Sequence, residues 1–93
     1  MTDPTYSQFE TQAHTDGFDE VLERQWPPLK QVDMHTHPFA VQALVVQGEM
    51  WLTIGDATQH LQVGDTFELD SGVLHAERYG PEGATYWVAR RNG

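Results

Sequence analysis

Three histidines and one glutamine have the types and the spacing of a metal site. His35 and His37 are separated by one residue, and side chains at positions i and i+2 of an extended segment project from the same face. These two imidazoles can therefore share one ion. His75 and Gln42 are the best placed candidates for a third nitrogen and for an oxygen. Neutral imidazole suits zinc, copper, iron and nickel, whereas an amide oxygen favours harder ions.

The composition restricts the ligands of such a site further. The chain of 93 residues contains no cysteine, which excludes a disulfide framework and a thiolate zinc site. Any metal must then be held by nitrogen and oxygen. We expect one divalent transition ion, which could be iron, zinc, nickel, manganese or copper.

Two further polar residues follow His75 and are candidates for catalysis. Glu77 and Tyr79 lie at positions i+2 and i+4 from it, so all three share one face of a strand and can look into one cavity. Glu77 could transfer protons or supply a carboxylate ligand. The alternative is a solvated or arginine-paired residue. His14 and His60 lack partners at ligand spacing, and we expect them to be exposed.

Length and charge limit the class of protein. A chain of 93 residues with 39% hydrophobic content supports one core. Its 14 acidic and 5 basic residues give a formal net charge of -9, which disfavours binding to nucleic acid or to anionic membranes. No segment reaches transmembrane length, and residues 1–10 lack the apolar part of a secretion signal. We therefore expect a cytoplasmic protein.

The elements that must position these residues are short strands. Apolar, β-branched and aromatic runs alternate with glycine-rich turns every 8 to 12 residues or so, which is typical of an all-β sandwich or barrel with seven or eight strands. Pro27-Pro28 ends an edge strand and begins a loop that leads into the histidine pair. Gly48 marks a turn or a bulge. The expected strands are 18–26, 40–47, 50–54, 59–63, 66–69, 75–79 and 85–90, with turns at 55–56, 64–65 and 70–72 and a loop at 80–83.

One segment is apolar on both faces and predicts an assembly. One face of residues 40–46 should line the interior, while the other needs a cover that a small domain does not supply by itself. We predict a homodimer in which a sheet face covers this surface. Residues 1–17 could contribute as a short helix or arm, with Tyr6 and Phe9 as anchors, although a disordered tail is the alternative.

The histidine pair opens a stretch that resembles the first motif of the cupin family. In that family two histidines separated by one residue are followed by a glutamate and then by a glycine that closes a strand. His35, His37 and Gly48 match the pattern, and Gln42 stands where the family usually has its ligating glutamate. The exchange removes one negative charge, which weakens metal binding but sharpens the Lewis acidity of the ion. Gln42 could also support a ligand instead of binding the ion.

The residues around His75 resemble the second motif of the family. That motif has a Gly-Asp pair, a Pro-x-Gly turn and a histidine three residues after the turn glycine. Gly64-Asp65, Gly72 and His75 match it, whereas Asp70 replaces the turn proline and Tyr79 replaces a frequent asparagine.

The resemblance covers about residues 19–90 and implies the fold. The implied fold is all-β: a small jelly-roll β-barrel over residues 18–93, preceded by the short helix or arm at 1–17. The domain boundary at residue 17 is an expectation from this pattern.

The resemblance also implies a metal inside the barrel and a small organic molecule as substrate or ligand. The family includes sites with three histidines and no acidic ligand, several of them iron or copper dioxygenases, and the present set is similar to those. Zinc, manganese or nickel would imply isomerase or lyase chemistry instead. The alternative is a non-catalytic module that binds or senses a small ligand. A metal-free sugar-nucleotide epimerase is disfavoured, because the sequence offers no basic pocket for a diphosphate.

Overall fold

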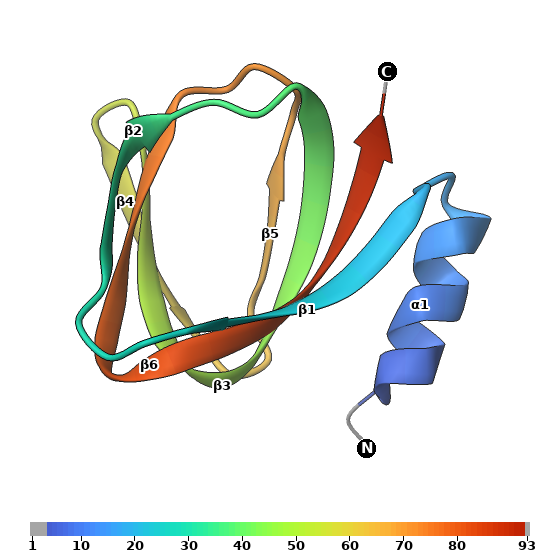
Figure 1. Ribbon diagram of the computed structural model, residues 1–93, viewed down its shortest axis with the longest axis horizontal. Helices are drawn as coiled ribbons and strands as arrows, with labels where there is room; N and C mark the ends of the chain where they lie inside the picture. Colours follow the sequence, from blue (N-terminus) through green and yellow to red (C-terminus); the bar gives the residue numbers. More distant parts are fainter. Residues whose placement is uncertain (1–3, 93) are drawn as a thin grey trace.

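The computed structural model describes residues 4–92, and within them the chain forms one α-helix and six β-strands. In chain order the elements are α1 (Tyr6–Thr15), β1 (Glu20–Trp26), β2 (Gln31–His35), β3 (Phe39–Ile54), β4 (Ala57–Gln62), β5 (Thr66–Leu69) and β6 (His75–Asn92). The strands curve around one interior, and the helix packs outside it, next to β1 and the carboxyl-terminal part of β6 (Figure 1). This confirms the predicted all-β fold with a short N-terminal helix.

Two long strands carry the sheet. β3 and β6 are antiparallel and pair along almost their whole length, from Phe39 opposite Asn92 to Ile54 opposite His75. The strand order is β1-β6-β3-β4, with β2 paired to β6 and β5 paired to β3. β1 is an edge strand, as the sequence predicts for residues 18–26.

The strands are fewer and longer than the seven or eight expected. The expected strands 40–47 and 50–54 form the single strand β3, and the expected loop 80–83 lies within β6. Gly48 and Gly83 have φ angles of +72° and +75°, and a Cβ atom on Gly48 would collide with the carbonyl oxygen of Gly83. The two strands therefore bend together at glycine bulges, where their backbones touch, and need no loop.

One strand of the structure, β2, was not predicted from the sequence. The segment after Pro27-Pro28 was expected to remain a loop as far as the histidines, but Gln31–His35 forms β2 and places His35 opposite His75 on β6. Three of its five residues are exposed, so the segment shows no clean apolar alternation.

The helix covers an outer face of the sheet within the same chain. Thr5 caps α1 and shares a capping box with Gln8. The rings of Tyr6 and Phe9 lie 5.5 and 6.0 Å from the ring of Trp87 on β6, and the Tyr6 hydroxyl donates to the carbonyl of Val21 at 3.2 Å. Residues 6–15 are thus a helix instead of a tail, and Tyr6 and Phe9 anchor it to its own chain, whereas their part in a homodimer stays a prediction. Within residues 4–92 no helix is long and apolar enough to cross a membrane.

The interior is filled by alternate residues of the strands. On β3 the side chains of Val41, Ala43 and Val45 are buried, while the residues between them are partly exposed. Met50 and Leu52 continue this buried row beyond the bulge. The apolar segment 40–46 therefore has one inward face, as predicted, and an outer face whose cover by a second chain remains a prediction.

Candidate metal centre

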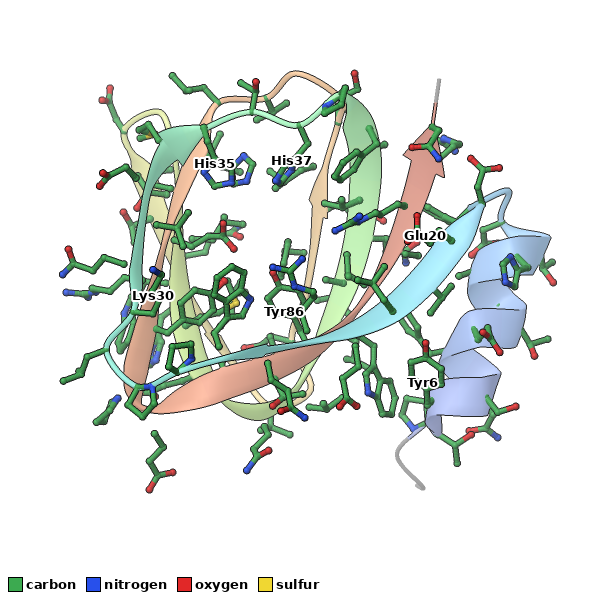
Figure 2. All side chains as sticks on the ribbon, in the orientation of Figure 1. Tyr6, Glu20, Lys30, His35, His37 and Tyr86 are labelled. Atoms are coloured by element: carbon green, nitrogen blue, oxygen red, sulfur yellow. The ribbon has the colours of Figure 1, made fainter. Side chains whose placement is uncertain are left out.

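Three histidines converge at one end of the interior. One ring nitrogen from each of His35, His37 and His75 lies within 4.8 Å of the others. His35 ends β2, His75 begins β6 in register with it, and His37 lies in the connection to β3. Figure 2 shows His35 and His37 pointing into the space between the strands. The strand pair thus brings together histidines that are 40 residues apart in the sequence.

Two of the imidazoles are held in the tautomer that a metal ligand needs. Nδ1 of His35 lies 2.7 Å from the carbonyl oxygen of Asp33, and Nδ1 of His75 lies 2.9 Å from the carbonyl oxygen of Val73. A carbonyl oxygen only accepts, so each Nδ1 carries the proton and donates. The lone pair of each neutral ring is then on Nε2, which is the geometry that orients metal-binding histidines in proteins.

A carboxylate faces the same two nitrogens. Oε2 of Glu77 lies 3.5 Å from Nε2 of His35 and 3.8 Å from Nε2 of His75. Glu77 is buried, with 8% of its surface exposed, and its Oε1 accepts a 2.6 Å hydrogen bond from the Tyr79 hydroxyl. Nitrogen lone pairs and a buried carboxylate oxygen repel one another unless a metal ion lies between them or a ring nitrogen carries a proton. The donor set therefore fits a divalent ion. We call these four residues the histidine site: His35, His37, His75 and Glu77.

The environment keeps His37 neutral. Burial lowers its pKa below the ordinary value of 6.5, and the nearby His75 and His35 lower it further. Glu77 opposes this shift, and Arg90 adds to it. The uncharged imidazole is the form that binds a metal.

Gln42 is not brought to the site. On β3 the neighbouring Val41 lines the cavity, while Gln42 projects from the opposite face, in register between Glu68 of β5 and Ala89 of β6. Side chains on a strand alternate between its two faces, so an offset of one residue reverses the face. The motif spacing predicted that Gln42 faces the site, but in the actual register Val41 does. We therefore remove Gln42 from the expected ligands, and the carboxylate oxygen that faces the histidines is Oε2 of Glu77.

Tyr79 acts on the site through its neighbour. Its side chain is 1% exposed, stacks on Trp26 at 5.0 Å and 13°, and reaches the histidine site through its hydrogen bond to Glu77. Burial raises the pKa of Tyr79 far above its ordinary value, and Tyr86 and Glu77 raise it further. The phenol therefore stays protonated and donates to the carboxylate.

The histidine site opens into a cavity of about 100 Å³. Hydrophobic side chains form much of its wall: Val32, Phe39, Val41, Phe67, Leu69 and Val88. Arg24, Trp26, Tyr86 and Arg90 complete it. The sequence did not predict that Arg24, Trp26 and Arg90 line a cavity, although the alternation of residues 18–26 places Arg24 and Trp26 on one face.

The two remaining histidines lie outside the site, as predicted. His14 is exposed, and its Nδ1 lies 3.0 Å from the carbonyl oxygen of Phe18. His60 is exposed on β4, where it stacks on Trp51 and pairs with Glu49 at 3.1 Å.

Solved structures with a similar fold include cupins. An RmlC-like cupin from Shewanella frigidimarina superposes with a TM-score of 0.69 at 19% identity, over 78% of this chain and 65% of that one. A protein with a double-stranded β-helix domain from Klebsiella pneumoniae gives 0.67 at 25% identity, over 78% and 66%. A variant of oxalate decarboxylase from Bacillus subtilis gives 0.70 at 23% identity, over 78% and 21%. The chain spans less than two thirds of the length of each of these proteins.

The sequence also matches a family model. Residues 17–91 match the AraC-like ligand binding domain, whereas no curated protein matches the chain. The matched segment contains β1 to β5, β6 as far as residue 91, and the histidine site. The chain therefore belongs to the family of AraC-like ligand binding domains and is a small cupin.

Proposed function

We propose that this chain is a metal-dependent ligand-binding cupin, in which the histidine site holds one divalent transition ion that faces a small organic molecule in the cavity. The observation that carries the proposal is the convergence of the three imidazoles, with the Nδ1 atoms of His35 and His75 already engaged by backbone carbonyls. Three neutral nitrogens and one carboxylate oxygen suit iron, zinc, manganese, nickel or copper. When bound, the ion would polarise a molecule that enters an open coordination position.

Glu77 gives this site a charge that the expected glutamine would not have provided. A carboxylate attracts a divalent ion more strongly than an amide does, because the contact is between opposite charges. The Tyr79 hydroxyl holds the second oxygen of the carboxylate, at 2.6 Å, and so orients the first toward the histidines. We therefore assign Glu77 to the ion and Tyr79 to the positioning of Glu77.

The rest of the wall favours binding over turnover. Among residues 4–92, Glu77 is the one carboxylate that lines the cavity, and both of its oxygens face a partner. Burial raises the pKa of Tyr86, and the charge of Glu77 raises it further, so this phenol stays neutral. Among the described residues, no general base outside the histidine site then lines the cavity. Ligand binding is also what the description of the family names.

A metal-dependent enzyme, dioxygenase-like or an isomerase or lyase, is the second candidate. It is supported by the three-histidine set, which leaves positions on the ion open to substrate, and oxygen chemistry at such an ion needs little acid-base help. The oxalate decarboxylase of similar fold contains Mn(II) centres, but at 24% identity that likeness concerns the fold alone. Consumption of dioxygen by the iron-loaded protein when a small molecule is added would favour this candidate.

The metal content of two histidine variants tests the proposal. Tag-free protein should bind one ion per chain, as measured by mass spectrometry after desalting. The variant His37→Ala should lose the ion, because one of three converging nitrogens is removed. His60→Ala is the matched control and should keep it, since His60 lies outside the barrel. Equal metal content in the two variants would reject the site.

A further inference from the structure

Two of the few basic residues line the cavity without forming an ion pair there. The chain has 14 acidic residues and 5 basic ones, and two of the latter, Arg24 and Arg90, line the cavity. Neither forms an ion pair with a carboxylate of residues 4–92. In so acidic a chain, a carboxylate partner for each arginine would have been easy to provide. The unpaired arginines indicate that an anion comes from outside.

Arg90 holds an unfilled donor beside the histidine site. Its Nε atom is buried and has no hydrogen-bond partner among the described residues. Its Cζ atom lies 4.6 Å from the centre of the Phe39 ring, and that ring stacks on His37 at 4.8 Å and 6°. One aromatic ring thus contacts both the guanidinium and a histidine. A buried donor without a partner is destabilising, and more so when it is charged.

A second unfilled donor lies on the same wall. Nε1 of Trp26 is buried and forms no hydrogen bond of ordinary geometry among residues 4–92, although it lies close enough to the Tyr86 hydroxyl to lower the pKa of that phenol. The guanidinium of Arg24 lies 4.9 Å from the Trp26 ring, since both side chains project from one face of β1. Arginine and the indole N–H can only donate. This wall therefore presents donors and positive charge to whatever occupies the cavity.

We propose that the ligand is a small organic carboxylate, bound by Arg90 and the Arg24–Trp26 wall, with a second oxygen directed to the ion of the histidine site. Arginine pairs with a carboxylate through two parallel hydrogen bonds. The cavity of about 100 Å³ is far below the roughly 300–1,000 Å³ of pockets for drug-sized molecules, so the ligand has few atoms. This inference rests on the proposed function for the ion, but its arginine contacts are independent of it.

The test compares a carboxylate with its neutral isostere. Glycolate and glycolamide are titrated into metal-loaded and metal-free protein by calorimetry, with inorganic phosphate as a third probe. Glycolate should bind at least tenfold more tightly than glycolamide. Arg90→Gln should abolish this difference while the metal content stays unchanged. Arg91→Gln is the matched control, because the neighbouring Arg91 is exposed and lies over Phe18 at 5.3 Å.

Each outcome separates this inference from the proposed function. Equal binding of glycolate and glycolamide to both forms of the wild-type protein would overturn the inference, as would an unchanged difference in Arg90→Gln. Tighter binding of phosphate than of glycolate would reject a carboxylate. If Arg90→Gln does not fold, Arg24→Gln provides the same comparison. A wild-type protein that binds no metal but still distinguishes the probes through Arg90 would reject the proposed ion and support the carboxylate.

Discussion

The interior of this barrel has two parts of opposite character, although β3 and β6 contribute to both. The packed part contains Val45, Met50, Leu52 and Tyr79, none of them more than 1% exposed. The part around the histidine site encloses a cavity and carries two buried donors, Nε1 of Trp26 and Nε of Arg90, that form no hydrogen bond within residues 4–92. The densely packed part therefore contributes to stability, whereas the part with the cavity carries the groups that can bind an ion and a ligand. Tyr79 marks the boundary, because its ring lies in the packed part and its hydroxyl reaches Glu77.

The largest expected effect comes from the packed part. Met50→Ala should lower the free energy of unfolding by about 2–5 kcal/mol, because it leaves a cavity where Met50 is fully buried. Met34→Ala makes the same change at a side chain of β2 that is 46% exposed, and it should stay within about 0.5 kcal/mol. Urea unfolding of the metal-free proteins measures both. Similar losses in the two variants would erase the distinction between the packed part and the surface.

A change at the boundary should affect both parts. Tyr79→Phe keeps the stacked ring but removes the hydroxyl that holds Glu77, and affinity for the divalent ion should fall by about 10–100-fold. Tyr6→Phe removes a hydroxyl that donates to the carbonyl of Val21 outside the barrel, so affinity should be unchanged. Competition with a chelating dye gives both values. Wild-type affinity in Tyr79→Phe would show that Glu77 does not need this hydrogen bond.

The pH dependence of stability sharpens the contrast at the histidine site. The folded state lowers the pKa of His37 below 6.5, chiefly by burial, so on acidification the unfolded state takes up a proton first. Stability is therefore complete above the unfolded pKa and is lost as the pH falls through the lowered folded value. Metal-free wild type should lose more stability between mildly alkaline and mildly acidic pH than His37→Gln does. Parallel pH profiles from urea unfolding would contradict this assignment.

The smallest effect is expected outside the barrel. Phe9→Ala removes one ring from the contact between α1 and Trp87 and should cost about 0.5–1.5 kcal/mol without changing metal affinity. Gln12→Ala on the exposed side of the helix is the control.

Light scattering on the same samples tests the predicted homodimer. A monomer mass at every concentration would reject that assembly.

The all-β fold could be predicted from the sequence, because the residues that indicate strands and turns act locally. The turn glycines, the β-branched runs and the two histidine motifs each predict a strand or its end, and these predictions agree with one another. The sequence did not predict that β3 and β6 bend together at Gly48 and Gly83. The contact between these glycines arises only when the two strands pair over their full length. Strand β2 was missed because its exposed residues hide the alternation.

The sequence predicted those site residues whose position depends on spacing along the chain. It failed for a residue whose position depends on the register of a strand. The histidines follow from the i, i+2 spacing and the later motif, whereas Gln42 depends on where the alternation of β3 begins, which the sequence does not reveal. Glu77 was considered as a carboxylate ligand from its distance to His75 along one strand, and the structure places it beside two imidazoles. Arg90 lies far along the chain from the histidines, so only tertiary pairing brings it to the cavity.

Anomalous diffraction from crystals grown with a divalent transition metal tests the central claim most directly. We expect one anomalous peak per chain, at about 2.0–2.2 Å from Nε2 of His35 and His75 and from Oε2 of Glu77, with His37 as a further ligand. The Nδ1 atoms of His35 and His75 should keep their backbone carbonyl partners. A peak at His60 and Glu49 instead, or crystals without any peak in the barrel, would contradict the account.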